Sequence, residues 1–270
     1  MKRINARLKK IIKKVFNIMR KPVMSILPGQ MSFFLLLSLI PTLLIVGIVT
    51  TSFSINVDGM IDFINTNFPA NTSKLIIPLL SGKGFDYNIV ILVFSALLLV
   101  SKGARAIITA ANTIYKVEND GIKDSIKSFI IAVLLVLLIL FIIIIPVFGV
   151  WILRIIFGFV HNLDAADDII YIFNILKWPI SIFIIFFNVK LIYTISPNKL
   201  IKSESVTKGA LFTTFFWTIS TYIYSFYITH LSKYNIFYGG ASNIIILMLW
   251  IYLISYIFVL GMSINASADV

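Results

Sequence analysis

The sequence predicts an all-α polytopic membrane protein in which six transmembrane helices follow a basic amphipathic N-terminal helix. The chain of 270 residues is 59% hydrophobic and only 13% charged, whereas soluble domains are about half apolar and about a quarter charged. Several apolar runs approach the roughly 20 residues that a helix needs to cross a bilayer core of about 30 Å. The basic residues also gather at alternate ends of these runs, the pattern that membrane orientation produces.

Residues 1–22 form the first predicted domain, a helix at the cytoplasmic surface of the membrane. The segment holds nine Lys or Arg residues and no acidic residue, without the continuous apolar core of a signal peptide. Its apolar residues recur at helical spacing: Ile4, Leu8, Ile11, Ile12, Val15, Phe16 and Met19. Such a helix is suited to lie among anionic lipid headgroups. The alternative is a basic anchor that only sets the orientation of the first span.

Residues 23–270 form the second predicted domain, a bundle of six spans. The predicted spans are Met31 to Phe53, Tyr87 to Ser101 with an amphipathic continuation toward Tyr115, Ile126 to Phe157, Ile175 to Ile195, Gly209 to Ile228 and Asn243 to Ala266. Pro41 in the first span and Pro146 in the third are expected to kink or break their helices. Membrane helices tolerate such breaks where neighbouring helices satisfy the freed backbone groups.

The charge distribution predicts the orientation of these spans. With the N-terminus in the cytoplasm, 18 of the 23 Lys and Arg residues fall on the inner side of the membrane. The outer connection after the third span instead carries Asp164, Asp167 and Asp168. We therefore expect a multi-pass protein with both termini in the cytoplasm. Because orientation explains most of the net charge of +12, nucleic acid is not an expected partner.

No pattern of catalytic or metal-binding residues stands out in the sequence. His161 and His230 fall in predicted outer loops, and neither has a second ligand at metal spacing on its own helix. The chain has no cysteine, which excludes disulfides and thiolate metal sites. It also lacks a Gly-rich phosphate loop, a nucleophile elbow and an HExxH sequence. We expect no catalytic, cofactor or metal site, and a protein that is not an enzyme.

The fifth predicted span carries a polar face within an otherwise apolar helix. Its residues are Thr213, Trp217, Ser220, Thr221 and Tyr224. One interpretation is hydrogen bonding to neighbouring helices, the usual role of hydroxyl groups in spans; the other is the wall of a polar cavity or substrate path. Two alternatives also apply to Lys190, which lies near Tyr193 in the fourth span. It either extends to the headgroups or faces the bundle, where it would bind an anionic headgroup or substrate.

The sixth predicted span follows a tight turn. Gly239 and its neighbour allow the chain to reverse, and Tyr238 is placed to anchor the turn at the membrane interface. Trp250 lies about 10 Å deeper than Asn243 at 1.5 Å per residue and is expected to face protein. Near the inner end, Gly261 lets another helix approach closely, and Asn265 is placed to hydrogen-bond across that contact.

Several of these segments together resemble the YihY/BrkB family of bacterial inner-membrane proteins. The segments are GQMSFFLLLSLIP, ITAANTIYKVE, IYTISPNKL, TKGALFTTFFW and YGGASNIIILMLWIYLISYIFVLGMSINA, and their order covers nearly the whole chain. The resemblance assigns recurrent family positions to Ser38, Pro41, Asn112, Tyr115, Tyr193, Pro197, Gly209, Ala210, Trp217, Tyr238, Gly239, Trp250, Tyr252, Gly261 and Asn265. Gln30 and Met31 depart from the small, Ala- and Tyr-rich stretch expected at the start of the first span.

The resemblance implies a location in the bacterial cytoplasmic membrane and a contribution to envelope integrity. We expect a transporter or lipid-handling protein, acting on a lipid or small molecule that the sequence does not specify. The alternative is a non-transporting envelope scaffold, and neither reading fixes an oligomeric state. Some family members were once labelled ribonuclease BN, but a membrane ribonuclease is the least expected function because the chain does not cluster the metal ligands that a nuclease needs.

Overall fold

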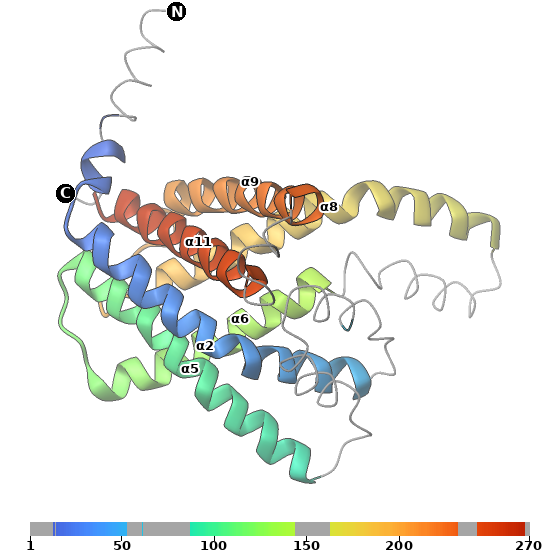
Figure 1. Ribbon diagram of the computed structural model, residues 1–270, viewed down its shortest axis with the longest axis horizontal. Coiled ribbons are helices and arrows are strands. Elements are labelled where there is room, and N and C mark those ends of the chain that lie inside the picture. Colours follow the sequence, from blue (N-terminus) through green and yellow to red (C-terminus); the bar gives the residue numbers. More distant parts are fainter. Residues whose placement is uncertain are drawn as a thin grey trace, which may run out of the picture.

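The computed structural model describes residues 13, 15–52, 61, 87–143, 163–231 and 242–267. Within these ranges the long elements are helices: α2 (Val23–Ser52), α5 (Tyr87–Tyr115), α6 (Gly121–Ile143), α8 (Leu163–Ile195), α9 (Thr207–Leu231) and α11 (Ser242–Ala266) (Figure 1). Each predicted span overlaps one of them, which confirms the all-α class. Outside the described residues lie Pro146, Gly149, His161, Tyr238, Gly239 and most of the predicted N-terminal helix.

Four stretches have the length and hydropathy of membrane spans: Val93–Tyr115, Gly121–Phe141, Ile170–Ile195 and Ile245–Ala266. Val23–Leu39 is a shorter apolar helix. The threonines, serines and tyrosines of α9 lower its hydropathy, which is why it stands apart from the four although it has 25 residues.

The bounds of α2 and α5 bear on two features predicted from the sequence. α2 begins at Val23, ahead of the predicted Met31, and continues through both Pro28 and Pro41. Pro41 therefore does not end the helix. The predicted amphipathic continuation of the second span is confirmed, because α5 runs without interruption to Tyr115.

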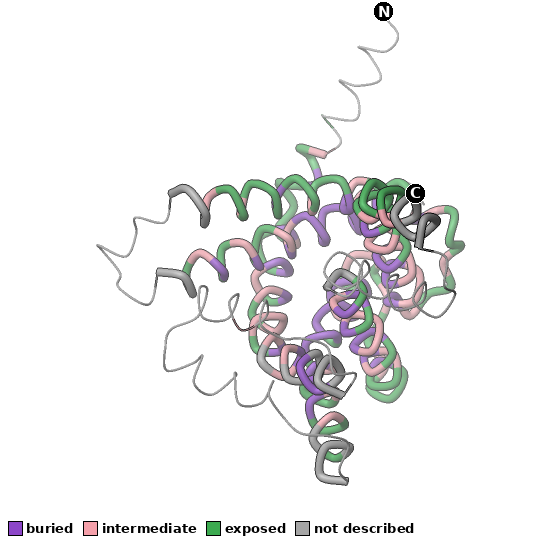
Figure 2. The backbone as a smooth tube through the Cα atoms, turned by 90° about the vertical axis from the view of Figure 1, so that its right-hand side faces the viewer, coloured by how far each residue is buried: buried purple, intermediate pink, exposed green. Residues whose placement is uncertain are grey.

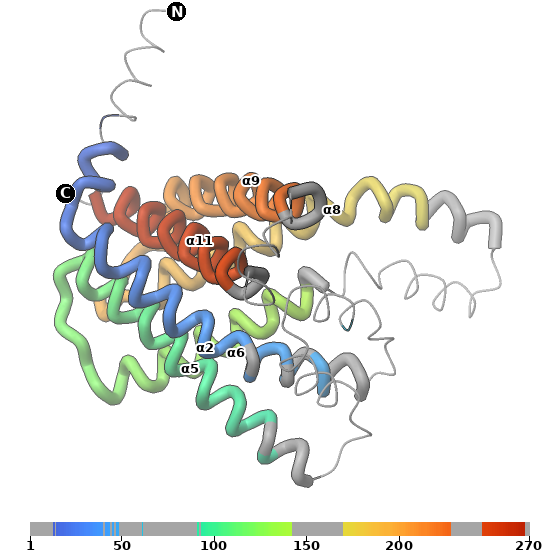
Figure 3. Tube along the Cα trace, in the orientation of Figure 1, coloured from blue at the N-terminus to red at the C-terminus, as the bar shows by residue number. Residues whose placement is uncertain are grey.

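The helices form a closed ring. α2 packs against α5, α5 against α6, α6 against α8, α8 against α9 and α9 against α11, and α11 returns to pack against α2. We call the end of the bundle at which α2 begins and α11 ends the terminal end; the α5–α6 connection also lies there (Figure 3). The opposite end is called the distal end. α9 starts beside the last turns of α11, so the α8–α9 connection also lies at the terminal end.

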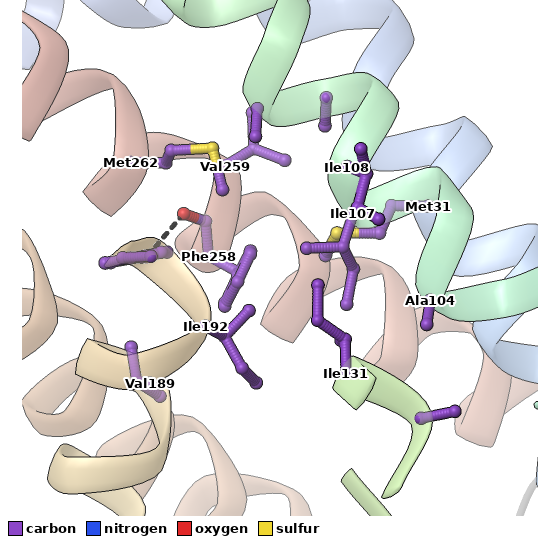
Figure 4. Packing of buried hydrophobic residues seen from close by; sticks show 14 of the residues in the cluster. Met31, Ala104, Ile107, Ile108, Ile131, Val189, Ile192, Phe258, Val259 and Met262 are labelled. Carbon is purple, nitrogen blue, oxygen red and sulfur yellow. Dashed lines mark hydrogen bonds between the residues drawn. The ribbon is translucent and has the colours of Figure 1, made fainter. Parts of the chain in front are cut away.

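The main apolar core lies toward the terminal end. It joins the second half of α5, the last turns of α8 and the second half of α11 to α2 and α6. Figure 4 shows Ile107 and Ile108 of α5 facing Ile131 of α6, with Ile192 of α8 and Phe258 of α11 beside them. Because lipid tails are as apolar as these side chains, close packing and hydrogen bonds between helices hold such a core together.

The distal part of α8 is packed very differently. From residue 170 to residue 180, no side chain of α8 is buried, and this part of the helix projects from the bundle (Figure 1). Figure 2 shows the same contrast over the whole molecule, with buried residues on the facing sides of the helices and exposed residues around them. The tightly packed part of the bundle therefore lies toward the terminal end.

Candidate functional site

A close helix contact joins α9 to α11 through two glycines. A Cβ atom placed on Gly261 would lie 2.6 Å from the Tyr193 hydroxyl oxygen and 2.9 Å from the Gly209 carbonyl oxygen. A Cβ atom on Gly209 would collide with the Gly261 carbonyl oxygen and with the Asn265 side chain. Asn265 uses this proximity, because its Oδ1 accepts a 2.7 Å hydrogen bond from the Gly209 N–H. That N–H lies in the first turn of α9, where no carbonyl of the same helix is available to it.

Tyr193 connects α8 to this contact. Its side chain is completely buried, and its ring centroid lies 4.7 Å from that of Phe258. The Tyr193 hydroxyl donates a 2.6 Å hydrogen bond to the Phe258 carbonyl and lies 2.6 Å from the Thr213 hydroxyl. Three helices are thus joined at the buried phenol of Tyr193. We use the name Tyr193 junction for the group formed by Tyr193, Gly209, Thr213, Gly261 and Asn265.

Trp217 continues the contact one turn along α9. Its Nε1–H donates a 2.8 Å hydrogen bond to the Ile254 carbonyl of α11, and its ring stacks on Phe258 at a centroid distance of 5.8 Å. For Thr213 and Trp217, the observed geometry matches the interpretation of a polar face that bonds neighbouring helices.

The other residues of the predicted polar face differ in exposure and in their contacts. Ser220 is buried, whereas Thr221 is exposed. Tyr224 lies nearer the distal end, where its ring stacks on Trp250 at a centroid distance of 5.0 Å. The Tyr224 hydroxyl and the Trp250 Nε1 are buried and have no hydrogen-bond partner among the residues that the structure describes.

Lys190 is half-buried on α8, three residues before Tyr193. Its Nζ lies 6.0 Å from the ring centroid of Phe186 on the same helix. This position gives a cation–π contact without an ion pair in the described part of the chain.

A second polar cluster joins α5 and α6 to the end of α8, and sequence reasoning missed it. The Asn198 side-chain N–H donates a 2.6 Å hydrogen bond to the buried Asp124 carboxylate. The Asn198 side-chain oxygen accepts a 2.9 Å bond from the Lys127 ammonium, which also donates to the Pro197 carbonyl at 2.7 Å. Asn198 thus bridges a carboxylate and an ammonium. We call Asn112, Asp124, Lys127 and Asn198 the asparagine latch.

Asn112 completes the latch from α5. Its side-chain oxygen accepts a 2.8 Å hydrogen bond from the Asn198 backbone N–H, and its side-chain N–H donates to Asn119 at 2.9 Å. α5 ends just beyond it at Tyr115. The next residue, Lys116, has a φ of 55° that reverses the chain, and the Val117 N–H donates to the Asn112 carbonyl at 2.8 Å. Such left-handed residues commonly end helices.

Asp120 then begins α6. Its carboxylate accepts hydrogen bonds of 3.2 Å from the backbone N–H groups of Ile122 and Lys123, as an N-cap residue does. The backbone N–H of Lys123, followed by its ammonium group at 3.1 Å, holds the pKa of Asp120 below its ordinary value. The cap fixes the register of α6, and with it the positions of Asp124 and Lys127.

The family positions expected from sequence lie mostly at helix contacts. Ser38 lies where α2 meets α5, since a Cβ on Gly103 would come within 3.1 Å of its hydroxyl oxygen. Tyr115 is half-buried at the end of α5, and Tyr252 is exposed on α11 beside Tyr256. Among the described residues, no three His, Cys, Asp or Glu side chains are grouped as metal ligands would be.

The similarity of this chain to known proteins extends over almost its full length. Residues 18–270 match the model of the virulence factor BrkB family. The chain belongs to the virulence factor BrkB family. The BrkB match begins at residue 18, near the end of the predicted N-terminal helix, and includes both the Tyr193 junction and the asparagine latch.

Individual relatives extend this result. YfkH of Bacillus subtilis, named as a ribonuclease-like protein, is 30% identical over 247 residues, which are 88% of this chain and 87% of YfkH. UPF0761 membrane proteins of Pseudoalteromonas translucida and Glaesserella parasuis are 32% and 37% identical over 76 and 71 residues, about a quarter of each chain. No solved structure matches the chain significantly. This BrkB-family chain is therefore similar to proteins that are named as membrane proteins.

Proposed function

We propose that this BrkB-family protein crosses the bacterial cytoplasmic membrane six times, with both termini in the cytoplasm. α2 has 30 residues and α9 has 25, so they extend about 45 Å and about 37 Å at 1.5 Å per residue, more than the roughly 30 Å of a bilayer core. α9 packs against two helices with the hydropathy of spans. Basic residues gather at the terminal end, which favours the cytoplasm for that side.

We further propose that the protein is a transporter or a lipid-handling protein of the envelope. The observation that carries this proposal is the asparagine latch at the seam between α6 and α8. In the ring, this seam is one of the two places where the first three helices meet the last three, the other being the contact of α11 with α2. The latch holds this seam with hydrogen bonds between polar side chains, each of which typically contributes about 0.5–1.5 kcal/mol net, more when charged groups take part. Water at the membrane surface can replace such bonds, so the seam can open while the Tyr193 junction stays intact.

This movement would be the opening of one half of the bundle against the other, as in many transporters. It predicts that fixing the latch stops flux. Because the chain has no cysteine, the double variant Asp124→Cys/Asn198→Cys provides the only thiols for cross-linking across the seam. In proteoliposomes, we expect oxidation of this variant to abolish lipid scrambling or solute flux, and reduction to restore it.

Two controls separate the outcomes. The variant Asp120→Cys/Asp124→Cys places both thiols on one turn at the start of α6, so its oxidation should leave flux unchanged. Wild-type protein that shows no flux of lipids, ions or metabolites beyond empty vesicles would contradict the transport proposal. Flux that persists in the cross-linked latch variant would instead show that the seam does not move.

The second candidate function is an envelope scaffold without transport. The Tyr193 junction favours it, because Thr213 is 0% exposed and the polar face predicted to line a path is here filled by helix packing. A scaffold would co-purify with a defined envelope partner after cross-linking in cells, and oxidation of the latch variant would not change that partner. Loss of envelope integrity without any flux in vitro would support this function.

Two further proposals rest on sequence and relatives. The basic helix of residues 1–22 would bind anionic headgroups. A synthetic peptide of residues 1–22 should therefore bind anionic vesicles more strongly than neutral ones. A ribonuclease function, suggested by the name of YfkH, is the least favoured. It predicts metal-dependent RNA cleavage by pure protein that is lost when one acidic pair is replaced.

A further inference from the structure

Two positive charges on α5 lack a negative partner. Lys102 and Arg105 are both exposed and lie within the apolar stretch Val93–Tyr115. Arg105 donates hydrogen bonds to two neutral oxygens of α6, the Ser125 hydroxyl at 3.1 Å and the Gly121 carbonyl at 3.4 Å. Within the described residues, the side-chain ion pair joins Lys123 to Asp120, and neither Lys102 nor Arg105 has a carboxylate partner. A charge in an apolar stretch requires a counter-charge or a position at the headgroups.

The two contacts with α6 orient the Arg105 guanidinium without neutralising it. An arginine side chain has five N–H donors in a planar fork, and the hydrogen bonds to Ser125 and Gly121 leave most of them free. Free donors of this kind bind phosphate oxygens in pairs. Lys102 lies three residues earlier on α5, on the same face of the helix, and adds a second charge to the position.

An apolar stripe leads away from these charges toward the distal end. Phe94 and Leu98 are exposed on the face of α5 that also bears Lys102 and Arg105, at spacings of four, four and three residues. The Phe94 ring lies 6.3 Å from that of Phe129 on α6, so the stripe borders both helices. From Phe94 to Arg105 the helix rises about 16 Å, which is about the thickness of one hydrocarbon leaflet.

We propose that this face of α5 and α6 binds an anionic phospholipid from the leaflet at the terminal end. The phosphate contacts Arg105 and Lys102, and an acyl chain lies along Leu98 and Phe94. The charges supply the attraction for the phosphate, and the leaflet-length apolar stripe favours a lipid over free phosphate. Basic positions between helices at the cytoplasmic side of membrane proteins bind lipid headgroups in the same way. This inference does not depend on whether the protein transports anything.

Native mass spectrometry of the full-length protein tests the proposal. The detergent-purified protein is titrated with dioleoylphosphatidylglycerol and, separately, with neutral dioleoylphosphatidylcholine. We expect the wild type to retain phosphatidylglycerol preferentially, and Lys102→Gln/Arg105→Gln to bind its first phosphatidylglycerol about tenfold more weakly. The matched control is Lys199→Gln/Lys202→Gln, which removes two charges from exposed positions in the α8–α9 connection. It should retain the lipid as the wild type does.

Equal lipid retention by the double variant and the wild type would overturn the proposal, as would an equal loss in the control. Displacement of the lipid by millimolar inorganic phosphate would show a site for free phosphate instead. If the double variant does not fold, Lys102→Gln alone keeps the Arg105 contacts with α6 and should weaken binding severalfold. A phosphatidylglycerol with a photoreactive acyl chain should label wild-type residues 91–105 or 122–130, and labelling confined to other segments would also overturn the assignment.

Discussion

The two ends of the α9–α11 pair are built from opposite kinds of side chain. At the terminal end, Gly209 and Gly261 bring the backbones together, and the hydroxyl groups beside them are hydrogen-bonded. At the distal end, the rings of Tyr224 and Trp250 stack between the helices, and their polar atoms have no hydrogen-bond partner within the described part of the chain. Because contact side chains set the distance between helix axes, the pair is closely joined at one end and spaced by aromatic rings at the other.

Polar groups contribute to the stability of this bundle at the terminal end more than at the distal end. In lipid, a hydroxyl group stabilises a helix contact only when it reaches a partner. The terminal end meets this condition through Tyr193, whose hydroxyl donates to the Phe258 carbonyl. The distal end does not meet it through Tyr224. Substitutions at equivalent positions of the two ends should therefore have different effects.

The largest effect is expected at the glycine contact. Gly261→Ala would place a methyl group against Tyr193, Thr213 and the Gly209 backbone, and such overpacking costs about 1–3 kcal/mol or more. We expect a large fall in the thermal unfolding temperature of the detergent-purified protein. Gly29→Ala is the matched control, because a Cβ at Gly29 meets no atom within 4 Å. An equal fall in the unfolding temperature of both variants would show that the close approach at Gly261 does not contribute more to stability than an open helix surface does.

The next effect is expected at the Tyr193 junction. Tyr193→Phe removes the hydroxyl that bonds the Phe258 carbonyl and the Thr213 side chain, leaving two buried polar groups without that partner. Such a loss costs about 1–3 kcal/mol, and a thermal unfolding series in detergent would measure it. An unfolding temperature equal to that of the wild type would contradict the role assigned to this hydroxyl.

The same change at the distal end should be neutral or stabilising. Tyr224→Phe keeps the ring that stacks on Trp250 and removes a buried hydroxyl for which the described residues offer no hydrogen-bond partner. Removing an unpaired buried polar group costs little or improves stability. The unfolding temperature is again the measurement. A loss as large as that of Tyr193→Phe would reveal a partner for Tyr224 and would remove the difference between the two ends.

A modest, pH-dependent effect is expected at the helix cap of the terminal end. The folded-state pKa of Asp120 is lowered by the backbone N–H and the ammonium of Lys123. Its stabilising contribution is therefore complete above the unfolded-state pKa of about 3.9 and is lost as the pH falls through the lower folded-state value. Asp120→Ala should reduce stability at neutral pH and flatten this acid dependence. Glu118→Gln, which removes a nearby exposed carboxylate that does not cap α6, should leave it unchanged.

The sequence allowed the fold class and part of the Tyr193 junction to be predicted. Apolar runs identify helices, and the spacing of Thr213 and Trp217 within α9 indicated a shared polar face. The asparagine latch could not be derived in this way, since Asn198 and Asn112 are 86 residues apart and only the ring of helices brings them together. Asn112 and Pro197 were singled out as family positions, but nothing in their local sequence indicated Asp124 and Lys127 as neighbours.

The closing of the ring between α11 and α2 has a consequence for biogenesis. α2 leaves the ribosome before the other described helices, yet it gains its contacts with α11 only after those helices have been made. Until then, the Tyr193 hydroxyl has no Phe258 carbonyl to bond, and the Gly209 N–H has no Asn265. A nascent chain that stops before α11 therefore lacks both of these hydrogen bonds, a difference that quality-control proteases and chaperones can recognise.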